Sequence, residues 1–199
     1  MLTLKPEATA SDNLSLPFSG NGIPDLLEEA KWALDWLENM QDPLDGGVFS
    51  LIKPSERFRY ETDLPQPVSG RWIYPKDTVP TAAFAAALAH AARHPLINLY
   101  YPDDAPRYLE KAIRAWQWLE ANPRYVNFHH YGQLWGDADE RVWAAVELYL
   151  ATGEEAYHNY FLVNHRPHER RWGWEHLLEG CGNATRSYLL NDTRERFPV

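Results

Sequence analysis

The stretch Ser19-Gly-Asn-Gly-Ile-Pro-Asp-Leu-Leu-Glu-Glu-Ala-Lys-Trp32 contains, in order, the signals that end a loop and begin a helix. Gly20 and Gly22 permit a sharp turn, and Pro24 suits the first helical position because its ring fixes φ near the helical value. Acidic residues in the next turn complement the positive end of the helix dipole. Apolar residues then recur at helical spacing, so the sequence predicts a helix over residues 24–40.

Further helices follow along the chain, separated by one long irregular segment. The alanine-rich residues 81–93 predict a buried inner helix, because small side chains let neighbouring helices approach closely. Residues 41–80 predict a loop excursion with short extended runs at 48–52 and 71–74. The remaining predicted helices end near Asn122-Pro123, cover 139–151 and 154–163, and run from Trp174 toward Leu190. The pattern predicts an all-α chain with six helices and almost no sheet.

Composition excludes several kinds of protein. A chain of 199 residues fits one domain by default, and its net charge of −9 argues against binding to nucleic acid. No apolar run approaches the ~20 residues that span a bilayer, and the N-terminus lacks the pattern of a signal peptide. We therefore expect a soluble chain without a nucleic-acid or membrane partner. The residues that could suggest zinc lack the spacing of a known zinc site: His129, His130, His165, His168 and Cys181.

A second helix-forming stretch, Gly136-Asp-Ala-Asp-Glu-Arg-Val-Trp-Ala-Ala-Val-Glu-Leu-Tyr-Leu-Ala-Thr-Gly153, completes a recognisable combination. Together with the 19–32 stretch it resembles the catalytic domain of glycoside hydrolase family 9, the inverting cellulases built on an (α/α)6 barrel. Gln41-Asp-Pro-Leu-Asp-Gly-Gly-Val-Phe49 and Tyr74-Pro-Lys-Asp-Thr-Val-Pro-Thr-Ala-Ala-Phe84 extend the likeness to about residues 15–190. The resemblance implies a partial (α/α)6 barrel with about six of its twelve helices. We expect one partial catalytic domain over residues 1–199, with residues 1–20 as a lead-in loop.

The resemblance implies that the catalytic carboxylates lie in segments other than these. The family's Asp-Ala-Gly-Asp motif, which carries the base, precedes the first stretch, and its acid Glu lies near the far end of the domain; neither motif occurs in this sequence. Inversion needs two carboxylates ~6.5–9.5 Å apart. Four loop acids are more readily explained as turn formers: Asp63, Asp77, Asp103 and Asp104. We assign no catalytic residue and expect this chain alone to be inactive.

Three acids lie at the start of the 139–151 helix: Asp137, Asp139 and Glu140. Carboxylates beside a loop that offers backbone carbonyls are hard oxygen ligands of the kind calcium prefers, although acids here could also simply cap the helix. The resemblance implies structural Ca²⁺, with a further acid before the last helix. The implied ligands are the carbonyls of Trp135 and Gly136 and the side chains of Asp139, Glu140 and Glu175.

Aromatic residues are abundant, with 9 Trp and 11 Tyr, and flat aromatic faces suit the apolar faces of sugar rings. Five tryptophans in helical stretches are expected to pack in the protein interior: Trp32, Trp36, Trp116, Trp118 and Trp143. Loop aromatics, where ligands are usually met, are the candidate substrate-binding residues, unless they only cover the core. They are Trp72, Tyr74, Tyr131, Trp135, Trp172 and Trp174.

The expected function is that of part of an inverting glycoside hydrolase acting on β-1,4-glucan (cellulose) or a related polysaccharide. The alternative is a non-catalytic carbohydrate-binding or structural helical module. Either kind of protein would have a polysaccharide or oligosaccharide as its partner. Half a barrel should also expose helix faces such as 82–92 and self-associate through them. The resemblance implies an extracellular or periplasmic location.

Overall fold

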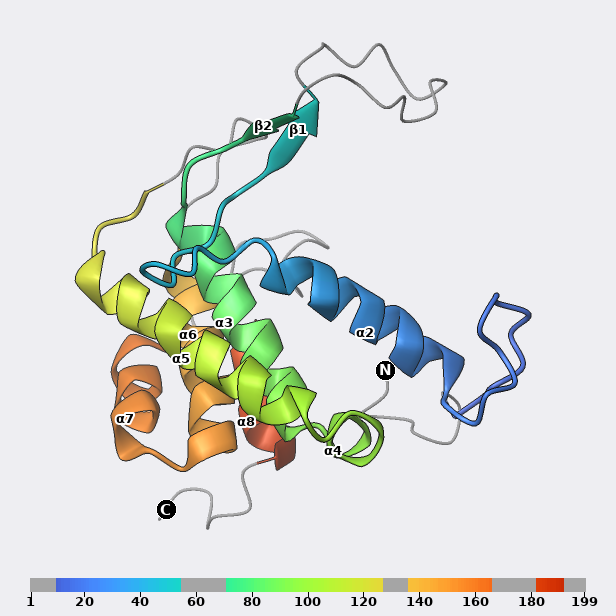
Figure 1. Cartoon of the computed structure of the whole chain (residues 1–199). Helices are drawn as coiled ribbons and strands as arrows, with labels where there is room; N and C mark the ends of the chain where they lie inside the picture. The colour runs from blue at the N-terminus through green and yellow to red at the C-terminus, as the bar shows by residue number, and fades with distance from the viewer. Residues whose placement is uncertain (1–9, 55–70, 127–135, 166–181, 192–199) are drawn as a thin grey trace.

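The computed structural model describes residues 10–54, 71–126, 136–165 and 182–191 (Figure 1). The helices in these ranges are α2 (Asp25–Glu38), α3 (Thr78–Arg93), α4 (Pro95–Tyr100), α5 (Asp104–Ala121), α6 (Ala138–Thr152), α7 (Glu155–Asn164) and α8 (Gly182–Asn191). Two strands, β1 (Ile52–Pro54) and β2 (Arg71–Ile73), form one antiparallel pair. The described chain is therefore a helical array with a single small hairpin, as the sequence predicted. None of its helices combines the length and apolar character needed to cross a bilayer.

The predicted helices occur, with shifted ends. Helix α3 begins at Thr78 rather than 81 because the side chain of Asp77 caps it, accepting a hydrogen bond from the amide of Val79 at 3.0 Å. Helix α6 ends at Gly153, whose φ of 75° is left-handed. The short helix α4 was not predicted; His94 caps it through its ring nitrogen. Residues 174–181 of the last predicted helix lie outside the described ranges.

Helix α3 packs between α5 and α6 (Figure 1). The four alanines at positions 82, 85, 86 and 89 are all 0% exposed, and α5 and α6 also carry fully buried alanines. Small side chains allow this close contact, so the prediction of an inner alanine-rich helix is confirmed. The expectation that residues 82–92 would present an exposed apolar face is wrong, because α5 and α6 already cover most of it.

Helix α2 is joined to α5 by a row of charged groups. Glu38 accepts two hydrogen bonds from Arg107, at 2.9 and 3.0 Å, and lies 3.3 Å from Lys111. About two helical turns before Glu38, Lys31 pairs with Asp104 on α5 at 2.9 Å. On α2, Leu27 is buried and Leu34 and Leu37 are partly buried against the core, so apolar packing accompanies the ion pairs.

Two tryptophans on α2 contradict the expectation that helical tryptophans pack inside. Trp32 is 73% exposed and Trp36 is 50% exposed, whereas Trp116 on α5 is buried. Trp32 and Trp36 are four residues apart and therefore share one face of α2. Exposed aromatic surface thus lies on α2, where the sequence predicted buried tryptophans.

The loop before α2 is held by two carboxylates. Asp12 accepts hydrogen bonds from the amides of Gly20 and Gly22 at 2.5 and 2.6 Å, and these bonds lower its pKa. Asp25, which is fully buried, accepts from the amide of Leu14 and the hydroxyl of Ser19. Both glycines have positive φ, so their amides can converge on one anion. The glycines of the Ser-Gly-Asn-Gly motif therefore allow two backbone amides to bind the carboxylate of Asp12.

Residues 41–47 form a tight turn against α5. Gly46 has a φ of +87°, and a Cβ atom there would lie 2.7 Å from the carbonyl oxygen of Arg114. A Cβ on Gly47 would lie 2.6 Å from the ring of Trp118. The amide of Gln41 donates to the carbonyls of Gly46 and Lys111, which fixes the turn to the helix. Only glycine allows so close an approach.

We predict that Gly46→Ala lowers the free energy of unfolding by about 2–4 kcal/mol, because it adds a backbone clash to an unfavourable left-handed conformation. Gly153→Ala is the matched control: its φ is +75°, but a Cβ there meets nothing within 4 Å. The control should therefore cost only about 1 kcal/mol. Urea denaturation of the two variants measures the difference, and equal losses would contradict the clash.

Candidate functional site

The start of α6 brings together the acids that the sequence singled out. Asp137 precedes the helix, and Asp139 and Glu140 lie in its first turn. Asp137 is engaged by Arg141, whose Nε donates to Asp137 Oδ2 at 2.9 Å. The same guanidinium donates to the carbonyls of Leu119 and Asn122, which ties the end of α5 to the start of α6. Asp139 and Glu140 remain as the acids that could bind a cation.

Glu140 has an unsatisfied buried oxygen. Its Oε2 atom is shielded from solvent and has no hydrogen-bond partner within the described part of the chain. Burial, a hydrogen bond with Asp139, and the negative charges of Asp139 and Asp137 raise its pKa from the ordinary value near 4.5 to about 8. A buried carboxylate that lacks a donor is costly unless a cation or a proton neutralises it. The local chemistry fits a hard divalent cation such as calcium.

Gly136, another implied ligand, has the backbone conformation that a tight loop before α6 needs. Its φ is +129°, and a Cβ there would meet nothing within 4 Å. The glycine is therefore required by conformation rather than by space. Its carbonyl lies in the loop that leads directly to the acid pair.

The rest of the implied ligand set lies outside the described residues: Trp135 and Glu175. Across 10–54, 71–126, 136–165 and 182–191, no three His, Cys, Asp or Glu side chains lie close enough to hold a metal ion. The described chain thus contains the acid pair Asp139 and Glu140 and the glycine beside it.

Glu140 gives a measurable pH dependence in metal-free protein. Because the pKa of Glu140 is raised in the folded state, the protonated form favours folding. This contribution to the free energy of unfolding is complete below the unfolded pKa near 4.3 and is lost as the pH rises toward 8. The full shift corresponds to at most about 5 kcal/mol, since one pKa unit is worth about 1.4 kcal/mol. We predict that the free energy of unfolding of the wild type in chelator falls between pH 5 and pH 8 relative to Glu140→Gln.

Urea denaturation of both proteins at the two pH values measures this difference. Groups that do not interact with Glu140 titrate equally in both proteins, so their contributions cancel in the comparison. Parallel pH curves for the two proteins would show that Glu140 is ionised without penalty and would contradict the prediction.

Two of the six candidate substrate-binding residues lie in the described ranges. Trp72, on β2, is 65% exposed, and Tyr74 follows it two residues later at the foot of the hairpin, where its amide donates to Leu51. Tyr74 lies one residue beyond β2, so the two aromatics are close along the chain at the strand pair. Tyr131, Trp135, Trp172 and Trp174 lie outside the described residues.

Two of the four acids considered for catalysis, Asp77 and Asp104, have structural partners. Asp77 caps α3, and Asp104 pairs with Lys31 and with Arg107 at 2.7 Å. Asp103 occupies the cap position of α5 without a capping hydrogen bond. Asp63 lies outside the described residues. The interpretation of Asp77 and Asp104 as structural residues agrees with these contacts.

Sequence reasoning missed a buried carboxylate in the middle of α6. Glu147 is 0% exposed, and its Oε2 accepts from Arg93 Nη2 at 2.6 Å and Nε at 2.9 Å, with His90 Nδ1 at 3.1 Å. Its Oε1 accepts from Ser187 at 2.5 Å and from the indole of Trp143 at 3.2 Å. The signal in the sequence was a single acid within the apolar run of α6, with apolar residues before and after it.

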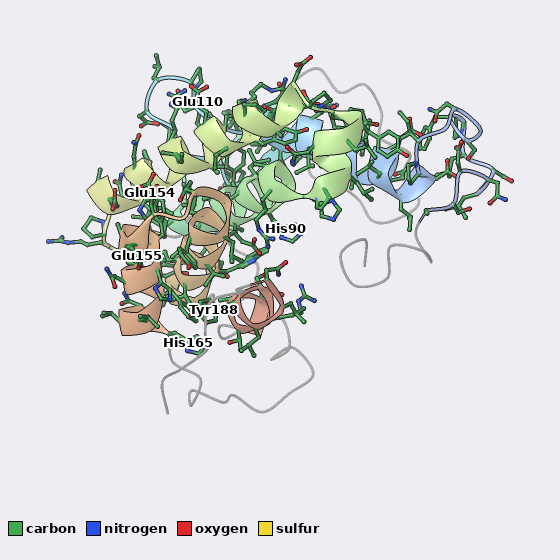
Figure 2. The ribbon with its side chains drawn as sticks, turned by 90° about the horizontal axis from the view of Figure 1, so that it is seen from below. His90, Glu110, Glu154, Glu155, His165 and Tyr188 are labelled. Carbon is green, nitrogen blue, oxygen red and sulfur yellow. The ribbon has the colours of Figure 1, made fainter. Side chains whose placement is uncertain are left out.

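The environment of Glu147 keeps it ionised. Burial alone would raise its pKa, but the hydrogen bond and charge of His90, the charge of Arg93 and the hydroxyl of Ser187 together lower it to about 2. Figure 2 labels His90 on α3 and Tyr188 on α8, the helices on either side of this cluster. We call Glu147, Arg93, His90, Ser187 and Trp143 the Glu147 cluster.

Comparison with known proteins identifies the family. The model of glycosyl hydrolase family 9 matches residues 6–192. The chain belongs to glycosyl hydrolase family 9. It is 35% identical over 164 residues to the xyloglucan-specific endo-β-1,4-glucanase BoGH9A of Bacteroides ovatus, covering 72% of this chain and 27% of that protein.

Solved structures agree with this assignment. A metagenome-derived family 9 endoglucanase superposes with a TM-score of 0.77 and 34% identity, over 94% of this chain and 34% of its own. AaCel9A, solved in complex with a cellobiose-like isofagomine, gives a TM-score of 0.72 and 26% identity, over 86% of this chain and 33% of its own. The described helices are thus part of the family's all-α barrel, and the chain spans about a quarter to a third of these relatives.

Proposed function

We propose that this chain is a sector of an inverting β-1,4-glucan hydrolase, in which it supplies a calcium-binding helix start and glycan-contacting aromatics. The observation that carries the proposal is the family match over residues 6–192, together with the buried Oε2 of Glu140 at the start of α6, which has no hydrogen-bond partner within the described residues. Cellulose or a related polysaccharide is the proposed substrate, since relatives include a xyloglucan-specific endo-β-1,4-glucanase.

Calcium is the proposed structural cofactor. When bound, it would supply positive charge that neutralises Asp139 and Glu140 and links them to the carbonyls of Trp135 and Gly136, with Glu175 as the further ligand. Its chemistry here is structural. The unsatisfied oxygen of Glu140 and its raised pKa support this assignment, because both are consistent with a carboxylate arranged around a cation.

The residues of this chain would act on the substrate through binding and orientation. Trp72 and Tyr74 offer aromatic faces on the hairpin, and the proposed sugar contacts also include Tyr131, Trp135, Trp172 and Trp174. A base and an acid from other segments would perform the inversion. An extracellular or periplasmic location is proposed with this function, because polymeric glucans are met outside the cytoplasm.

We predict that this chain alone binds cello-oligosaccharides weakly and releases no reducing sugar from carboxymethyl cellulose or xyloglucan. Trp72→Ala should weaken binding about fivefold or more, since a sugar-stacking aromatic contributes on the order of 1 kcal/mol. Leu99→Ala, an exposed apolar residue on α4, is the matched control. Reducing-sugar release would overturn the assignment of catalysis to other segments. Unchanged binding in Trp72→Ala would remove the hairpin from the sugar site.

Self-association is proposed through α2 instead of α3. Trp32 and Trp36 present an exposed aromatic pair, and burying such a pair is favourable. We predict that the wild type self-associates with rising concentration in sedimentation velocity and that Trp32→Gln/Trp36→Gln does so less. Leu99→Gln is the control, because it changes an exposed apolar residue on α4. Equal self-association in the double variant and the wild type would exclude α2 as the contact.

A further inference from the structure

The Glu147 cluster joins three helices through one buried charge. Arg93 and His90 reach Glu147 from α3, Ser187 reaches it from α8, and Trp143 reaches it along α6 itself. The two carboxylate oxygens of Glu147 have different partners. Oε2 accepts from the side chains on α3, and Oε1 accepts from Trp143 and Ser187. Glu147 therefore links α6 to two neighbouring helices, α3 and α8, which are also linked to each other by a hydrogen bond from Arg93 Nη1 to Asn191 Oδ1 at 3.3 Å.

The cluster lies on the same stripe of α6 as the candidate metal ligand Glu140. Positions 140, 143 and 147 are three and four residues apart and so share one face of a helix. Glu147 is two turns, about 11 Å, along the axis from Glu140. Trp143 lies between them and hydrogen-bonds Glu147 through its indole at 3.2 Å.

The hydrogen bonds that Glu147 makes to α3 and α8 restrain the rotation of α6 about its axis. Side-chain ends lie about 5–6 Å from the axis of a helix, so a rotation of about 10° moves them by about 1 Å. Calcium–oxygen distances fall within about 2.3–2.6 Å, a far narrower range. The position of Glu140 relative to ligands on other segments therefore depends on how firmly the rotation of α6 is fixed.

We propose that Glu147 is a positioning residue for the calcium site, acting by fixing the rotation of α6 through Arg93 on α3 and Ser187 on α8. This inference rests on the proposed calcium site. Glu147 does not contact the ion. Two contacts carry the claim, the pair of hydrogen bonds from Arg93 and the hydrogen bond from Ser187, because together they tie one carboxylate on the stripe to two neighbouring helices.

Calorimetric titration of Ca²⁺ into chelator-stripped protein tests the inference, with the free energy of unfolding measured in parallel. Glu147→Gln keeps the shape of the side chain but removes its charge, and should weaken calcium binding about tenfold, as loss of groups that orient metal ligands commonly does. Glu38→Gln is the matched control. It removes a carboxylate that pairs with Arg107 and Lys111 on α5, away from α6, and should leave the calcium Kd within about twofold of the wild type.

The outcomes separate the two proposals. Asp139→Ala removes a proposed ligand and should abolish binding; absence of binding in the wild type itself would overturn the calcium site. Wild-type binding with an unchanged Kd in Glu147→Gln would overturn the positioning role. If Glu147→Gln does not fold, Ser187→Ala, which removes one hydrogen bond, takes its place and should weaken binding about threefold or more. An unchanged Kd in Ser187→Ala would then overturn the role.

Discussion

The contact of α3 with α5 and α6 through alanine is the constraint on which the described structure depends. Alanines at 0% exposure on all three helices allow the helix backbones to approach closely, and larger side chains at these positions would push the helices apart. The separation set by this contact fixes where α6 begins relative to the end of α5. It also brings His90 and Arg93 within hydrogen-bond distance of Glu147. Both the candidate metal site and the buried charge cluster follow from it.

Two glutamates on one stripe of α6 behave in opposite ways. Glu147 is more buried, yet its pKa is lowered to about 2, because His90, Arg93 and Ser187 satisfy its charge. Glu140 is less buried, and its pKa is raised to about 8 by burial, with its carboxylate neighbours adding to the shift. Burial alone therefore does not decide the charge state of either residue. The difference comes from the partners: hydrogen-bond donors surround Glu147, whereas Oε2 of Glu140 has none within the described residues.

Local signals in the sequence were enough to place most helices, because caps, prolines and periodicity act over a few residues. The alanine-rich segment was correctly predicted to be an inner helix. Long-range contacts could not be read in the same way. Glu147 binds residues on α3 and α8 that lie 40–57 positions away in the sequence. The exposure of Trp32 depends on what covers α2. The acid pair at 139 and 140 was predicted as a metal site, whereas its unsatisfied oxygen became apparent only from the structure.

The attachment of α2 has a consequence for the order in which the protein forms. Glu38 and its partner Arg107 are 69 residues apart, so α2 leaves the ribosome well before the helix that neutralises its charges exists. During that interval the nascent chain carries an unpaired acidic helix end beside two uncovered indoles. The loop that precedes α2 is held by hydrogen bonds to Asp12 and Asp25 from residues near them in the sequence, so these bonds do not require α5. The contacts of the loop are therefore all available before α5 emerges, whereas the contacts that dock α2 require α5.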